Sequence, residues 1–221
     1  MDENEILNTG TPEEFRKSEG IHRPEQKLSL YLAGCLATAR TQQQRPLSAH
    51  EIEDVERQAA FDFAEEHGLW ISDLYLLGVP LKGGGNENTL AYDKVNRVVY
   101  KSNNLFNSQN SLSKFLENIQ VHNTLFPETM YELVGFTGIE KGTGKVPYIE
   151  PIVKQDYIPN AQQAVQEDID NYMNNLGFDK INDHTFTNSE YTISDLRPRN
   201  VLKDANGTIY VVDDIILGNQ Q

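Results

Sequence analysis

Residues 194–200 read Ser-Asp-Leu-Arg-Pro-Arg-Asn, and after an Asn-Gly turn residues 209–214 read Ile-Tyr-Val-Val-Asp-Asp. The acid Asp195 is followed five positions later by the amide Asn200, then by a short apolar hairpin and a second acid, Asp213. Mg²⁺ binds few protein oxygens and completes its shell with phosphates and water. This order of groups therefore predicts a site for a phosphate-bound metal ion, with Asn200 and Asp213 as ligands and Asp195 orienting an attacking hydroxyl. The alternative is an ordinary surface loop and hairpin, because Asn-Gly turns and acidic loops are common.

The composition limits the partners of this chain. It has 221 residues and a net charge of −14, and such a surface repels a nucleic-acid backbone, so we expect no extended DNA or RNA binding. No apolar run approaches the ~18–20 residues that span a membrane, and the acidic first residues lack the features of a secretory signal. The single cysteine, Cys35, excludes an internal disulfide. We therefore expect a cytoplasmic protein without a membrane partner. A nucleotide site stays compatible, because it needs only a few local donors and a metal.

Residues 1–68 are predicted to form a helical N-terminal extension. Apolar residues recur every three or four positions over residues 28–39, which indicates an amphipathic helix. Ser48 and Glu51 have the spacing of a capping box that opens a second helix, and Gly68 is a suitable end for it. The extension either packs on the main domain, which is the simpler interpretation, or forms a hairpin that docks a partner.

Residues 69–221 change to an α+β pattern. The predicted strands cover residues 74–81, 89–92, 97–101, 131–136 and 148–154. One helix is predicted to begin at Ser111, between the third and fourth strands. A second helix is predicted over residues 161–176, and the hairpin that carries Asp213 follows it.

A glycine loop and a lysine form a second candidate group. Gly83, Gly84 and Gly85 lie between the first two predicted strands, where backbone N–H groups of a glycine turn can approach phosphates closely. Lys101 ends the apolar run Val-Val-Tyr-Lys, and an inward-pointing lysine needs an anionic partner to offset its desolvation. Either observation alone is weak, since glycine triplets are often flexible loops and a lysine at a strand end is ordinary.

The complete order of these elements resembles the protein-kinase fold. The shared features are a glycine loop, Val-x-x-Lys, a helix, a hinge strand, Asp-Leu-x-x-x-x-Asn, and two hydrophobic residues followed by Asp, together covering about residues 71–217. Two further stretches are similar to the kinase-like domains of bacterial polyvalent proteins from phages and conjugative elements. The first runs from His122-Asn123 through Phe126-Pro127 to Tyr131-x-Leu133-Val134-Gly135-Phe136. The second is Tyr191-x-Ile193-x-Asp195-Leu196.

The resemblance implies a fold and a division of the chain. It implies a minimal kinase-like domain over residues 69–221, with an N-lobe at about 71–155 and a reduced C-lobe at about 156–221. The N-lobe is expected to be a five-stranded antiparallel sheet with one inserted helix. The C-lobe is expected to contain the catalytic hairpin.

The resemblance also implies ATP and Mg²⁺ as cofactors and a role for each motif residue. Gly83, Gly84 and Gly85 would cover the phosphates, and Lys101 would pair with the α- and β-phosphates. Glu117 is the candidate helix carboxylate for Lys101, although its place on the helix also allows it to be simply solvated. The backbone of residues 155–157, between Gln155 and Tyr157, would contact the adenine. Asp195 would be the catalytic base, Arg197 would reach the γ-phosphate, and Asn200 and Asp213 would hold the metal.

Several positions depart from the kinase pattern. Asn88 replaces the third glycine of the loop, and Ile193-Ser194 replace the His-Arg pair before the catalytic acid. Asp214 and Ile215 replace the Phe and Gly that usually follow the metal-binding acid. Only eight residues follow Asp213 in this sequence, so we expect no activation segment, no Ala-Pro-Glu motif and no large helices for peptide binding.

Two functions remain open at this stage. The first is a minimal ATP- and Mg²⁺-dependent phosphotransferase, whose acceptor could be a protein or a small molecule. The second is a catalytically inactive kinase-like module that binds a nucleotide or a protein partner. The presence of Lys101, Asp195, Asn200 and Asp213 together favours the enzyme, because a module that only binds has no need of a base.

Overall fold

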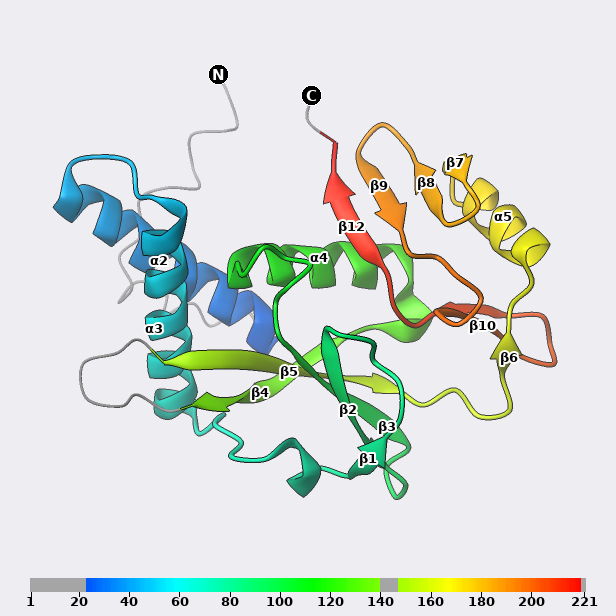
Figure 1. Cartoon of the computed structure of the whole chain (residues 1–221), viewed down its shortest axis with the longest axis horizontal. Coiled ribbons are helices and arrows are strands. Elements are labelled where there is room, and N and C mark those ends of the chain that lie inside the picture. The colour runs from blue at the N-terminus through cyan, green and yellow to red at the C-terminus, as the bar shows by residue number, and fades with distance from the viewer. Residues whose placement is uncertain (1–22, 140–146, 220–221) are drawn as a thin grey trace. The chain divides into compact units, whose positions relative to one another are not determined.

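The computed structural model describes residues 23–139 and 147–219 and divides the chain into two compact units (Figure 1). The first unit contains the chain up to Leu116 together with Glu132–Lys154, and the second contains Glu117–Tyr131 together with the chain from Gln155 onward. Both units combine helices with antiparallel strand pairs, which confirms the α+β class. The part of the predicted extension before residue 23 lies outside the described residues. Among the described residues, no helix is both long and apolar enough to cross a membrane.

Two helices form a hairpin in the first unit, as the sequence predicts. They are α2 (Pro24–Gln43) and α3 (Ala49–His67), which pack against each other. The capping box is present, because the Ser48 side chain accepts from the backbone of Glu51 and the Glu51 carboxylate accepts from the backbone of Ser48. Gly68 ends α3 in the left-handed conformation, with φ of 65°. Both helices contact β4 within the first unit, so in the described region the hairpin packs on its own domain.

A five-stranded sheet with an inserted helix forms the rest of the first unit. The strands, in the spatial order β1-β2-β3-β5-β4, are β1 (Val79–Leu81), β2 (Asn88–Asp93), β3 (Val98–Asn103), β5 (Tyr148–Asp156) and β4 (Glu132–Ile139). Helix α4 (Leu112–Leu125) follows β3 in the sequence, begins in the first unit and ends in the second. The order of strands and helix therefore agrees with the sequence prediction.

The first predicted strand is shorter than expected. Residues 74–76 form the 3₁₀ turn η2 (Leu74–Leu76), and only Val79–Leu81 pair with β2. The Asp73 carboxylate accepts from the backbone N–H of Tyr75 at 2.9 Å and so favours a turn here. The turn places Leu74 in a small core with Ala91 and Ile152.

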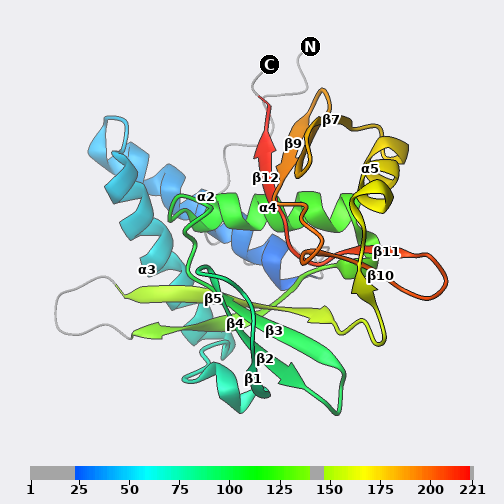
Figure 2. The same ribbon diagram turned by 45° about the vertical axis from the view of Figure 1, so that its right-hand side comes forward.

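The second unit is richer in strands than the sequence suggests (Figure 2). One sheet has the order β11-β10-β6 and the other β12-β9-β8-β7. Their strands are β6 (Gln162–Gln163), β7 (Asp179–Asn182), β8 (Thr185–Thr187), β9 (Tyr191–Ser194), β10 (Val201–Lys203), β11 (Ile209–Val211) and β12 (Ile215–Gly218). Helix α5 (Gln166–Asn175) is shorter than the predicted residues 161–176, because Gln162 and Gln163 pair with β10. The helix prediction was wrong for this first turn.

A single apolar core holds the second unit together. It contains residues from α5, from both sheets and from the segments that join these elements, namely Phe126, Ala164, Ile169, Met173, Phe178, Phe186, Ile193, Leu196, Val201, Val211 and Ile216. Leu196, which is fully buried, lies in the segment that connects the two sheets. The buried side chain of Leu196 therefore anchors the connecting segment to this core. Its anchoring also limits the movement of the polar residues on either side of Leu196 in the sequence.

Candidate functional site

The fold brings the acids and the amide of the predicted metal site to one place in the second unit. Residues 195–200 lead from β9 to β10, and residues 212–214 lead back from β11 to β12, so two connections join the same two sheets. The pairs Ser194–Ile215 and Val201–Val211 set the register on either side. The backbone N–H of Val212 donates to the carbonyl of Asn200 at 2.9 Å. Asp213 thus follows a residue that is directly bonded to Asn200.

The segment from Asp195 to Asn200 is a tight turn. Asp195 has φ of 59°, a left-handed conformation that Asp and Asn tolerate better than most residues and that often marks functional sites. The carbonyl of Asp195 accepts from the backbone N–H of Arg197 at 2.7 Å, and the carbonyl of Arg197 accepts from that of Asn200 at 2.8 Å. The backbone N–H of Leu196 donates to the carbonyl of His184 at 3.2 Å. The position of the Asp195 carboxylate is therefore set by the backbone.

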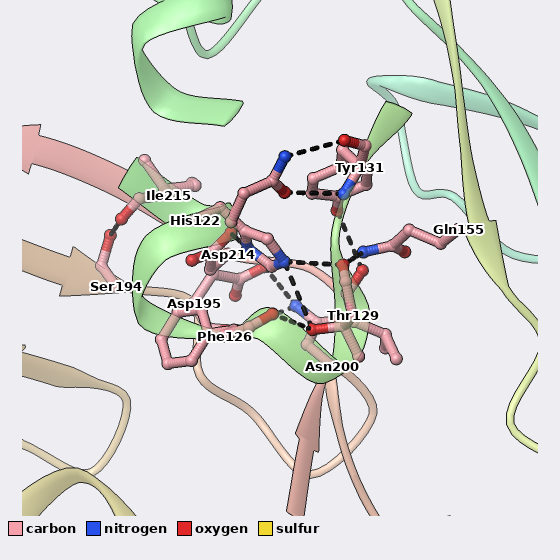
Figure 3. A network of polar contacts seen from close by, with 12 residues as sticks. His122, Phe126, Thr129, Tyr131, Gln155, Ser194, Asp195, Asn200, Asp214 and Ile215 are labelled. Carbon is pink, nitrogen blue, oxygen red and sulfur yellow. Dashed lines mark hydrogen bonds and ion pairs between the residues drawn. The ribbon is translucent and has the colours of Figure 1, made fainter. Parts of the chain in front are cut away.

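Both carboxylate oxygens of Asp195 have partners, of which Asn200 is labelled in Figure 3. Oδ2 accepts from Nδ2 of Asn200 at 2.8 Å, and Oδ1 lies 2.8 Å from Nε of Arg197. A more distant contact, 3.5 Å, joins Oδ2 to Arg199. The side chain of Asp195 is 26% exposed and that of Arg197 is 51% exposed, so the contact between them is open to water. Exposed ion pairs of this kind are weak and exchange partners readily.

The residues present fit a Mg²⁺ ion bound together with phosphates. Asn200 is buried, and its amide nitrogen is directed to Asp195, which leaves the amide oxygen to act as a ligand. Asp213 follows Val212, whose backbone N–H donates to the carbonyl of Asn200. A buried oxygen without a hydrogen-bond partner also lies next to this position, Oδ2 of Asp214. Among the described residues, no three His, Cys, Asp or Glu side chains gather as a metal centre. The donor set thus matches a metal that phosphates and water complete.

The glycine loop and Lys101 share one face of the sheet in the first unit. Gly83, Gly84 and Gly85 all have positive φ, between 61° and 128°. A Cβ atom on Gly84 would lie 2.2 Å from the carbonyl oxygen of Asn88 and 3.1 Å from the side chain of Leu90. Leu90 is the cross-strand partner of Lys101, and directly paired residues point to the same face. The loop therefore lies over the strand pair that carries this buried lysine.

The glycine loop is also tied to the connection between β3 and α4, which the sequence did not indicate. Glu87 accepts from the backbone N–H of Asn104 at 3.0 Å through its carbonyl, and its carboxylate accepts from the side chain of Asn107. The side chain of Asn103 donates to that of Asn88 at 2.9 Å. These contacts hold the glycine loop to the end of β3, the strand that contains Lys101, and to the residues that follow it.

Three other predicted residues have mixed surroundings. Glu117 is exposed on α4, so its pairing with Lys101 stays a prediction. The side chain of Gln155 is buried and donates to the carbonyl of Thr129 at 2.5 Å. Tyr157 is 40% exposed just beyond β5. The predicted contact of this segment with adenine involves the backbone, and that prediction is also untested.

The sequence analysis did not predict two buried polar contacts. Glu56 of α3 is 2% exposed, and its carboxylate accepts from the backbone N–H of Leu112 at 2.8 Å, at the start of α4. His122 of α4 pairs with Asp214 at 3.0 Å. His122 lies in the stretch that is similar to the kinase-like family, whereas Glu56 only interrupts an apolar face and Asp214 departs from the kinase pattern.

Comparison with known proteins gave one match. No curated protein and no solved structure is similar enough to count as a relative of this chain. A family model described as the serine/threonine/tyrosine kinase found in polyvalent proteins matches residues 53–219. The match begins inside α3 and includes the glycine loop, Lys101, both connecting segments and β12. The chain therefore belongs to the family of serine/threonine/tyrosine kinases found in polyvalent proteins.

Proposed function

We propose that this protein is an ATP- and Mg²⁺-dependent phosphotransferase of the kinase type. The observation that carries the proposal is the hydrogen-bonded unit of Asp195 and Asn200, in which Asn200 also bonds the backbone of Val212, the residue before Asp213. A base held by an amide that can also bind a metal is the arrangement that phosphoryl transfer requires, because this chemistry depends mainly on position and charge. The family match supports the reaction class.

Each candidate residue has a defined task in this proposal. Lys101 and the backbone of Gly83, Gly84 and Gly85 bind the phosphates. Asp195 accepts a hydrogen bond from the acceptor hydroxyl and orients it toward the γ-phosphate. Asn200 and Asp213 would hold Mg²⁺, which would neutralise part of the phosphate charge. The backbone of residues 155–157 binds the adenine, and Glu117 supports Lys101.

Arg197 must change partners before Asp195 can work as a base. Its Nε lies 2.8 Å from Oδ1 of Asp195, where a hydroxyl would otherwise bind. In the proposed reaction the γ-phosphate, which carries more charge than one carboxylate, attracts Arg197 and frees Oδ1. The acceptor is a hydroxyl of a protein or a small molecule, and the reaction takes place in the cytoplasm.

A second candidate function is favoured by that same contact. With Asn200 on Oδ2 and Arg197 on Oδ1, both oxygens of Asp195 already have a partner, so an acceptor hydroxyl must share one of them. A module that binds a nucleotide or a partner protein without catalysis could keep this contact permanently. The two candidates differ in one measurable property, the transfer of the γ-phosphate.

The test combines binding with transfer. A ligand at about 100 times its dissociation constant stabilises a protein by about 2.7 kcal/mol, so Mg·ATP at that excess should raise the melting temperature. Transfer of labelled γ-phosphate should fall about 100-fold or more in Asp195→Asn, since a general base contributes at least that factor. Asn tolerates the positive φ of this position, and Glu190→Gln, at an exposed residue, is the matched control. Binding without transfer in the wild type selects the inactive nucleotide-binding module. The absence of both contradicts the phosphotransferase and the nucleotide-binding module and leaves only a module that binds a partner protein.

A further inference from the structure

Asp214 has no task in the proposed reaction, yet it is almost completely buried. Its side chain is 5% exposed, and its Oδ1 lies 3.0 Å from Nδ1 of His122, which is 1% exposed (Figure 3). Both residues belong to the second unit. Removing one partner of a buried hydrogen-bonded pair leaves the other polar group unsatisfied, which is unfavourable. The pair is therefore a fixed connection between α4 and the segment that carries Asp213.

His122 is held at both of its ring nitrogens. Nδ1 faces the carboxylate of Asp214, and Nε2 lies 3.0 Å from the carbonyl oxygen of Thr129. The hydroxyl of Thr129 also lies 3.3 Å from Nε2. Both ring nitrogens therefore face polar atoms, and the ring cannot turn without losing these contacts. The ring also packs against Phe126 and Tyr131, with centroid distances of 5.2 Å and 4.6 Å.

The residue on the other side of Asp213 is anchored to the same part of the chain. The hydroxyl of Tyr131 donates to the carbonyl of Val212 at 3.0 Å. Tyr131 is fixed in turn by Asn123, whose side chain accepts from the backbone N–H of Tyr131 at 2.7 Å and donates to its carbonyl at 2.8 Å. Both neighbours of Asp213, Val212 and Asp214, are thus bonded to residues 122–131.

We infer that His122 is a positioning residue of the metal site, which sets the direction of the Asp213 side chain through Asp214. The inference rests on the proposed function, in which Asp213 is a ligand of Mg²⁺. The backbone of a residue fixes the direction of its Cα–Cβ bond and limits the rotamers of its side chain, and anchoring the residues on both sides fixes that backbone. Tyr131 is the second anchor of the same segment. Asp214, which departs from the usual kinase pattern, thereby acquires a role.

A positioning role and a merely structural role differ in their effect on the metal. Groups that orient metal ligands typically change metal affinity by about 10–100-fold when they are removed. If the pair only holds the fold together, its removal lowers the melting temperature but leaves the metal affinity of the folded protein unchanged. The readout is therefore the dissociation constant of Mn²⁺, a paramagnetic substitute for Mg²⁺, measured by electron paramagnetic resonance with a non-hydrolysable ATP analogue at saturation.

The decisive variant is Asp214→Asn, which keeps the shape of the side chain and removes its charge. We expect its Mn²⁺ affinity to fall about tenfold or more, while its affinity for the ATP analogue without metal stays within about twofold. The control is Phe126→Leu, which disturbs the same core next to the His122 ring but leaves both anchors in place. It should lower the melting temperature and leave the Mn²⁺ affinity within about twofold.

Tyr131→Phe removes one hydroxyl and keeps the ring, so it tests the second anchor even if Asp214→Asn does not fold. We expect it to weaken Mn²⁺ binding by at least about threefold. Unchanged Mn²⁺ affinity in the folded variants, or an equal loss in Phe126→Leu, overturns the positioning role and leaves the proposed function intact. A wild-type protein that binds no Mn²⁺ with the ATP analogue overturns the proposed function and the positioning role together.

Discussion

The side-chain amide of Asn200 donates to two different oxygens of Asp195, the main-chain carbonyl at 2.9 Å and the carboxylate Oδ2 at 2.8 Å. This one amide therefore holds both the backbone turn and the side chain of the candidate base. It also presents its own oxygen as a candidate metal ligand. In the proposed reaction, turn geometry, base orientation and metal binding would thus all depend on Asn200.

Asn200→Asp should be destabilising in spite of its small change in shape. The new carboxylate would face the carboxylate and carbonyl of Asp195 with no hydrogen to donate, and an unsatisfied buried polar group costs about 1–3 kcal/mol. Urea unfolding should therefore show a loss of that size. Asn171→Asp, the same change at an exposed position of α5, should stay within about 0.5 kcal/mol of the wild type. Equal stability of the two variants would contradict the bonding described for Asn200.

Two glycines of the loop provide a matched pair for a second prediction. Alanine at Gly84 or Gly85 must adopt a positive φ, which costs about 1–2 kcal/mol for a residue with a Cβ. At Gly84 the Cβ would also collide with the carbonyl of Asn88, whereas at Gly85 nothing lies within 4 Å. Gly84→Ala should therefore displace the loop and weaken ATP binding more than Gly85→Ala does. Titration calorimetry measures the difference, and equal affinities would mean that the loop does not contact the phosphates.

The elements with a strong periodic pattern were predictable from the sequence. The capping box at Ser48, the left-handed end at Gly68, and the order of strands around α4 all follow from local rules, and the structure confirms them. The grouping of Asp195 and Asn200 was also predictable, because five residues in a tight turn cannot place them far apart. The correct predictions therefore rest mainly on residues that are close together in the sequence.

What could not be predicted depends on distant parts of the chain. The strands β7 and β8 are three or four residues long and mostly polar, so they show no clear alternation. The first turn of the helix predicted over residues 161–176 is instead the strand β6, because it pairs with β10, which lies about 40 residues further along the chain. The pair of His122 and Asp214 joins residues 92 positions apart, and no periodic pattern reports such a contact.

The capping box predicts how stability changes with pH. Hydrogen bonds from the Arg45 side chain, and then from the backbone and hydroxyl of Ser48, lower the pKa of Glu51 to about 2. A lowered pKa means that the ionised form stabilises the folded state above the unfolded pKa of about 4.3, and that this contribution is lost as pH falls toward 2. The difference in melting temperature between the wild type and Glu51→Gln should therefore be complete at pH 7 and disappear near pH 2. A difference that is constant over this range would contradict the role of the charge.

Glu56→Gln tests whether α3 stabilises the start of α4. The carboxylate of Glu56 accepts from the backbone N–H of Leu112 at 2.8 Å and from that of Ser113 at 3.4 Å, so it caps the first turn of α4 with a buried negative charge. A negative charge is favourable at a helix N-terminus, and an amide group there would turn one of its own donors toward an N–H. We expect a loss of about 1–3 kcal/mol, together with faster hydrogen exchange at the backbone of Leu112 and Ser113. Glu65→Gln, on the exposed side of the same helix, should change neither. If exchange at the start of α4 stayed at the wild-type rate in Glu56→Gln, the cap would be unimportant, and α3 would be an appendage instead of a support for the helix that carries His122.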